Sequence, residues 1–153
     1  MRQMRTVSEI LQTVDLTELS NDINTSNKHR EMIKNGSDLD PNEVDKMIDV
    51  IQEYNVLQKT CYVLDDAIKA AVEERIKYKY LYEGTKEKEK SNEYLNKWID
   101  LSKEIEAMKS ELNYYNGLRA KREDEVITYD KLLDSTLDKI LEKEKANDKK
   151  EKR

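Results

Sequence analysis

The chain has 153 residues, of which 40% are charged and 37% apolar, with three Gly, one Pro and no Phe. So few turn residues and so much charge argue against a compact globule and are typical of long helices. The net charge of −5 lacks the basic surplus that most nucleic-acid-binding proteins show, although it leaves room for a local basic patch.

The expected compartment is a reducing cytoplasm. Cys61 is the only cysteine and therefore has no partner for a disulfide within the chain. The first ten residues, MRQMRTVSEI, lack the apolar core of a signal peptide, and no run approaches the ~20 apolar residues that cross a bilayer. We therefore expect an intracellular protein with no membrane partner.

Residues 1–34 predict a short N-terminal segment of one or two helices. Asp15 or Thr17 is placed to cap the second helix. The apolar residues that recur at helical spacing are Ile10, Leu11, Val14, Leu16, Leu19 and Ile23.

Residues 35–41 predict a turn between helices. Asn35-Gly36 is expected to end the preceding helix, and Asp40 to cap the following one. Pro41 suits the first helical position, and Glu43 completes a sequence typical of a capping box.

Residues 42–145 predict a long antiparallel coiled-coil helical hairpin with a break near 84–90. Two runs of residues keep a strict 3,4,3,4 spacing, which indicates helices wound on one another with a left-handed sense. The first run is Met47, Val50, Tyr54, Leu57, Cys61, Leu64, Ile68, Ala71, Arg75, Tyr78 and Tyr82; the second is Tyr94, Trp98, Leu101, Ile105, Met108, Leu112, Tyr115, Arg119, Arg122, Val126, Tyr129, Leu133, Thr136 and Ile140. Residues 146–153 are charged without an apolar face and predict a disordered tail. The predicted fold class is all-α.

The apolar stripe is wide enough to predict a homo-oligomer. Ile48, Ile51, Val72 and Ile76 lie beside the first run, where one antiparallel helix would leave them uncovered. The residues predicted to form the oligomerisation seam are Leu57, Leu64, Ile68, Trp98, Leu101, Ile105, Met108 and Leu112.

No residue pattern predicts catalysis, a metal site or a cofactor. His29 is the only histidine, and a lone histidine has no partner at the spacing of a metal site or a catalytic triad, so we predict an exposed surface residue. Cys61 occupies a seam position, which predicts a buried structural thiol. The chain also lacks a glycine-rich phosphate loop.

The sequence KYKYLYEG, residues 77–84, alternates as a strand would. Tyr78 and Tyr82 continue the first heptad run, however, so we predict a helix end. Lysine and arginine attract phosphates, and tyrosine rings stack on unpaired bases. The candidate nucleic-acid-binding residues are Arg75, Lys77, Tyr78, Lys79, Tyr80 and Tyr82.

A second interpretation of the same residues is structural. Arginines at seam positions, namely Arg75, Arg119 and Arg122, would then set the helix register by pairing with glutamates. The tyrosines would be bulky seam residues with their hydroxyl groups at the edge.

Three stretches resemble the UvsY-like recombination mediators of T-even-type bacteriophages. VDLTEL, residues 14–19, is similar to the family's early turn after a short helix. KYKYLYEG is similar to the end of its basic first long helix. WIDLSKEIEAMKSELNYY, residues 98–115, is similar to the start of its second long helix.

The resemblance implies a non-enzymatic helical protein that forms a ring-like homo-oligomer in the host cytoplasm. It implies binding to single-stranded DNA, remodelling of the phage single-strand-binding protein and loading of the recombinase. The alternative is a coiled-coil structural, assembly or adaptor protein that binds another protein and no nucleic acid. An acidic inhibitor that mimics phosphate charge is a third hypothesis.

Overall fold

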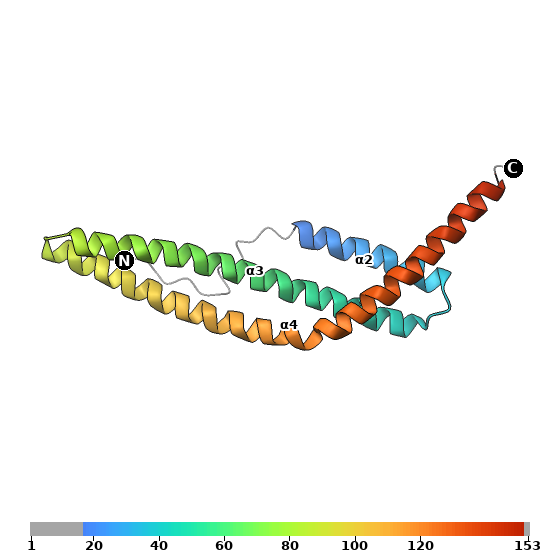
Figure 1. The fold of residues 1–153 in the computed structure, drawn as a ribbon, viewed down its shortest axis with the longest axis horizontal. Helices are drawn as coiled ribbons and strands as arrows, with labels where there is room; N and C mark the ends of the chain where they lie inside the picture. Colours follow the sequence, from blue (N-terminus) through green and yellow to red (C-terminus); the bar gives the residue numbers. More distant parts are fainter. Residues whose placement is uncertain (1–16, 152–153) are drawn as a thin grey trace. The chain divides into compact units, whose positions relative to one another are not determined.

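The computed structural model describes residues 17–151, with side chains up to residue 147. It consists of three helices in this range: α2 (Thr17–Gly36), α3 (Pro41–Gly84) and α4 (Lys88–Glu151) (Figure 1). No strand occurs in the described range, so the predicted all-α class is confirmed there. Within the same residues, no helix carries an apolar stretch of the length that a membrane crossing requires. The predicted helix of Ile10, Leu11 and Val14, and the cap at Asp15, lie outside the described residues.

The turn between α2 and α3 has the predicted design. Helix α2 ends at Gly36, and the Ser37 hydroxyl donates a hydrogen bond of 2.7 Å to the carbonyl oxygen of Ile33. Asp40 then caps α3, because its carboxylate Oδ1 accepts a hydrogen bond of 3.0 Å from the backbone N–H of Asn42. Pro41 is the first residue of α3.

The link between α3 and α4 is shorter than the predicted break. KYKYLYEG is helical and α3 ends at Gly84, as the heptad count predicts. The Thr85 hydroxyl donates to the carbonyl oxygen of Leu81 at 2.6 Å, which satisfies one acceptor of the last turn. Because α4 begins at Lys88, only residues 85–87 lie outside a helix.

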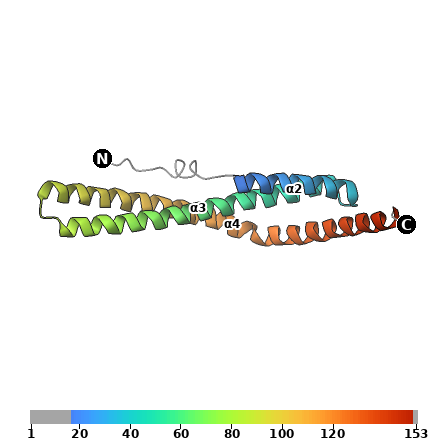
Figure 2. The same ribbon diagram turned by 90° about the horizontal axis from the view of Figure 1, so that it is seen from above.

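The described residues divide into two compact units. Unit 1 is Gln58–Leu118, and unit 2 comprises residues 17–57 together with residues 119–151. Helices α3 and α4 each contribute to both units, whereas α2 belongs to unit 2. Figures 1 and 2 both show α2 alongside the first part of α3.

Unit 1 is a pair of helical segments that pack along their heptad positions. The contacts of Arg75 with Ser102 and of Tyr78 with Tyr94 show that the two segments run antiparallel, because the numbers rise in α3 as they fall in α4. Its buried core is Leu64, Ile68 and Ala71 from α3 and Leu101, Ile105 and Met108 from α4. Cys61 is also buried, as predicted for a structural thiol.

Unit 2 contains three helical segments, which come from α2, from the first part of α3 and from the last part of α4. Arg30 of α2 reaches across to Asp45 and Asp49 of α3 at 2.9 and 2.8 Å, and Lys34 reaches Asp45 at 2.7 Å. The buried core is Ile33 from α2, Val44, Met47, Ile48 and Ile51 from α3, and Val126, Leu133 and Ile140 from α4.

Helix α2 corrects the prediction of an uncovered apolar stripe. Ile48 and Ile51 are buried in the same cluster as Ile33 of α2, so they do not present a surface to another copy. Val72 is partly buried within unit 1, and only Ile76 of this set is exposed, with 45% of its surface accessible. The predicted homo-oligomer loses this support and remains a prediction.

Helix α4 continues through residues 146–151, where the charged composition predicts a disordered tail. Ala, Glu and Lys have high intrinsic helix propensity, and a helix continues through such a segment without an apolar face to bury.

Candidate functional site

The end of α3 in unit 1 carries the residues that the sequence selects for nucleic-acid binding. Lys77, Lys79, Tyr80 and Tyr82 are exposed, and Tyr80 has 68% of its surface accessible. Within the described residues, Lys77 and Lys79 form no ion pair, so their positive charges are available to a ligand. The structure therefore brings these four residues to one solvent-facing helix end.

Arg75, the first of the remaining two candidates, lies between the helices. Its guanidinium carbon is 5.7 Å from the centre of the Trp98 ring, within the range of a cation–π contact. Its Nη1 atom donates a hydrogen bond of 3.4 Å to the Ser102 hydroxyl. Arg75 thus joins α3 to α4, but through Trp98 and Ser102 and not through the glutamate that the structural interpretation predicts.

Tyr78 is similarly engaged with α4. Its ring centre lies 6.3 Å from that of Tyr94, with the two planes tilted by 33°. The ammonium group of Lys97 is 5.2 Å from the centre of the Tyr78 ring. Because both aromatic and cationic contacts hold it against α4, the structure separates Tyr78 from the exposed candidates.

A shallow cleft, which we call the tip cleft, lies between these helix ends. Lys79, Tyr82 and Glu83 of α3 line one side, and Leu95 and Trp98 of α4 line the other. Trp98 is half-buried, and the sequence assigned it to the oligomerisation seam. Its heptad position predicts contact with α3, but its place beside Lys79 depends on the register between the helices, which heptad spacing does not give.

The other predicted seam residues pack inside the chain. Leu64, Ile68, Leu101, Ile105 and Met108 are buried in the core of unit 1. Leu112 packs against that core, and Leu57 is half-buried in unit 2. These side chains stabilise the fold of a single chain, and their contact with a second copy stays a prediction.

Of the arginines at seam positions in α4, Arg122 has the predicted acidic partner. Its Nη1 atom lies 2.9 Å from Glu53 Oε2, which links α4 to α3 within unit 2. The predicted pairing of this arginine with a glutamate is therefore confirmed.

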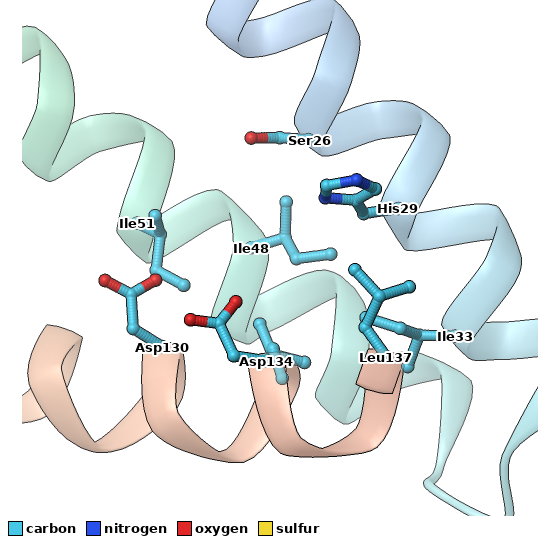
Figure 3. A pocket seen from close by; sticks show the side chains of 9 residues that line it. Ser26, His29, Ile33, Ile48, Ile51, Asp130, Asp134 and Leu137 are labelled. Atoms are coloured by element: carbon cyan, nitrogen blue, oxygen red, sulfur yellow. The ribbon is translucent and has the colours of Figure 1, made fainter. Parts of the chain in front are cut away.

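A second pocket lies within unit 2. His29 of α2, Ile48 and Ile51 of α3, and Asp130 and Asp134 of α4 line it, and in the view of Figure 3 the two isoleucines lie between the imidazole and the carboxylates. His29 is half-buried, so the prediction of an exposed surface residue is wrong, because α2 packs against α3 and α4. Burial raises the pKa of Asp130, and the neighbouring charge of Asp134 raises it further.

This second pocket lacks the arrangement of a metal centre. Among the residues whose placement is described, no group of three or more His, Cys, Asp or Glu side chains is positioned to hold a metal ion. The Arg30 side chain nearby is committed to Asp45 and Asp49. The tip cleft therefore remains the candidate site with uncommitted cations and aromatic rings.

Comparison with known proteins finds no matching family model, no matching curated protein and no matching solved structure.

Proposed function

We propose that this protein is a non-enzymatic single-stranded-DNA-binding recombination mediator, which helps to load a phage recombinase onto strands coated by single-strand-binding protein. The observation that carries the proposal is the tip cleft, where Lys79 and Tyr82 lie beside Trp98. Unpaired lysines supply attraction to phosphates, and aromatic rings supply stacking surfaces for bases. Lys77 does not line the cleft, but it is exposed near the same end of α3 and adds a second positive charge there.

Single strands suit this cleft better than a duplex does. The flat faces of bases are covered by their neighbours in a double helix, whereas an unpaired strand can turn a base toward an aromatic side chain. The resemblance to UvsY-like mediators supports two further parts of the proposal, namely that the protein forms a homo-oligomer in the host cytoplasm and that it loads a recombinase. We also propose that α3 and α4 together form the long antiparallel coiled-coil hairpin that the heptads predict.

The test is a salt titration of binding to a fluorescently labelled oligonucleotide, followed by anisotropy. Each phosphate contact on a single strand contributes about 0.7 to the slope of log affinity against log salt. The double variant Lys77→Ala, Lys79→Ala is expected to bind more weakly and to lower the slope by about 1.4, while circular dichroism stays unchanged.

The matched control removes two exposed lysines from the part of α4 in unit 2, as Lys121→Ala with Lys131→Ala. This control changes the net charge equally but leaves the tip cleft intact, so its slope should equal that of the unaltered protein. Absence of binding by the unaltered protein even at low salt contradicts the proposed function. Equal losses in both double variants show that net charge, and not the cleft, controls binding.

The second candidate function is that of a coiled-coil assembly or adaptor protein. Arg75 and Tyr78 favour it, because both take part in contacts between α3 and α4. Capture of a protein partner, together with no affinity for oligonucleotides at low salt, would support this candidate over the first.

A further inference from the structure

The tip cleft contains an aromatic ring, that of Trp98, which is in contact with Arg75. Arg75 contacts the Trp98 ring at 5.7 Å and donates to the Ser102 hydroxyl at 3.4 Å. That hydroxyl in turn donates to the carbonyl oxygen of Trp98 at 2.9 Å. The Arg75 guanidinium of α3 thus contacts the indole and is itself anchored to Ser102 of α4. Stacking of a ligand on Trp98 therefore costs little side-chain freedom of the protein.

The size of the cleft suits one small planar group. Its volume is about 270 Å³, just below the range of about 300–1,000 Å³ that small-molecule sites occupy. Tyr82, with 40% of its surface exposed, and the half-buried Leu95 complete the apolar walls beside Trp98.

Two charged groups at this cleft distinguish a nucleotide from an apolar protein side chain. Lys79 and Glu83 are one helical turn apart on α3, yet they form no ion pair with each other in the described structure. An apolar side chain would leave both charges without a partner. A nucleotide would engage both, because its phosphate pairs with an ammonium group and the exocyclic amine of adenine, cytosine or guanine donates to a carboxylate.

We propose that the tip cleft binds one unpaired, amino-bearing nucleobase, adenine, cytosine or guanine, against Trp98 and Tyr82. Lys79 holds the adjacent phosphate and Glu83 accepts a hydrogen bond from the exocyclic amine. Arg75 is a positioning residue that orients Trp98. This inference rests on the proposed binding of single-stranded DNA and adds to it the part of the strand that is recognised and the preferred bases.

Trp98 is the only tryptophan of the chain, so its fluorescence reports directly on the cleft. The experiment titrates the full chain with equally long strands of dC, dA, dT and abasic sugar-phosphate, and records tryptophan emission together with the anisotropy of a labelled strand. We expect dC and dA to quench the emission and to bind several-fold more tightly than dT. The abasic strand should bind weakly through its phosphates without quenching.

Two variants test the individual contacts. Tyr82→Leu keeps an apolar group but removes a stacking ring, and it should weaken dC binding about tenfold. Tyr62→Leu, at another exposed tyrosine of α3, is the matched control and should leave the affinity unchanged. Glu83→Ala should abolish the preference for dC over dT, whereas Glu73→Ala, at an exposed glutamate of the same helix, should preserve it.

The readouts separate the failure of this inference from the failure of the proposed function. Binding by anisotropy without quenching of Trp98 by dC overturns the base site, while DNA binding itself stands. Equal affinity for dC and dT in the unaltered protein overturns the role of Glu83. Absence of any anisotropy change, even at low salt, overturns both proposals together.

Discussion

Replacement of Ile33 by alanine is expected to detach α2 from the rest of unit 2. Ile33 is the buried residue of α2, with 1% of its surface exposed, and it belongs to the same apolar cluster as Ile48 of α3 and Ile140 of α4. The substitution removes methyl and methylene groups from a closed site, so the neighbouring side chains lose their contacts with them.

The size of the effect follows from comparing the apolar and ionic contributions. Truncation of a buried isoleucine to alanine costs about 2–5 kcal/mol, whereas a partly exposed ion pair contributes about 0–1 kcal/mol. The pairs from Arg30 and Lys34 to α3 are partly exposed. They are therefore too weak to hold α2 in place once Ile33 is truncated.

Urea unfolding followed by circular dichroism measures the loss of stability, and amide hydrogen exchange shows where it occurs. Protection should fall throughout α2 and persist in unit 1. The matched control is Ile127→Ala in α4 of the same unit, because Ile127 has 46% of its surface exposed and should change stability by less than about 0.5 kcal/mol. Equal losses of stability in the two variants would refute the assignment of Ile33 as the residue that secures α2.

Three further substitutions test the cap of α3 and the charges of unit 2. Asp40→Ala should cost about 0.5–2 kcal/mol in thermal or urea unfolding, because it removes the acceptor at the start of α3; an unchanged midpoint would contradict the cap. The Lys34 and Arg30 side chains lower the pKa of Asp45 through hydrogen bonds, so its carboxylate stabilises the fold above the ordinary aspartate range. Asp45→Asn should therefore destabilise the protein at neutral pH, and the difference should disappear as the pH falls through the lowered pKa of Asp45. Asp130 has a raised pKa, chiefly from burial, so its ionised form opposes folding. Asp130→Asn should raise the free energy of unfolding at neutral pH and leave it equal to that of the unaltered protein in acid. A lower free energy of unfolding at neutral pH, measured in urea, would contradict the raised pKa of Asp130.

Heptad spacing predicts which faces of α3 and α4 are buried in this structure. Leu64 and Ile105 occupy counted positions and are almost completely inaccessible, and most counted residues in either run are at least half-buried. The helix ends at Gly36 and Gly84 were also predicted, because a glycine and a following cap or break are local signals. These features depend on short-range chemistry that a single sequence displays.

Features that depend on contacts between helices could not be predicted from the spacing of residues within one helix. Helix α2 has few apolar residues, so its pattern gives no sign that it covers Ile48 and Ile51 or that it brings His29 toward two aspartates. Glu104 is charged and yet has only 2% of its surface exposed, which no periodicity indicates. The tip cleft likewise requires the register that places Trp98 opposite the end of α3.

The division of α3 and α4 between two units has a consequence for the order of folding. The described part of unit 1 is one continuous stretch, Gln58–Leu118, whereas the described part of unit 2 combines residues 17–57 with residues that follow position 118. Contacts between residues close in sequence form faster than distant ones, and a nascent chain leaves the ribosome from its N-terminal end. The cluster that contains Ile33 and Ile48 can therefore form completely only after Ile140 has been synthesised. We expect the antiparallel pair of unit 1 to act as the template on which the last part of α4 returns to the first part of α3.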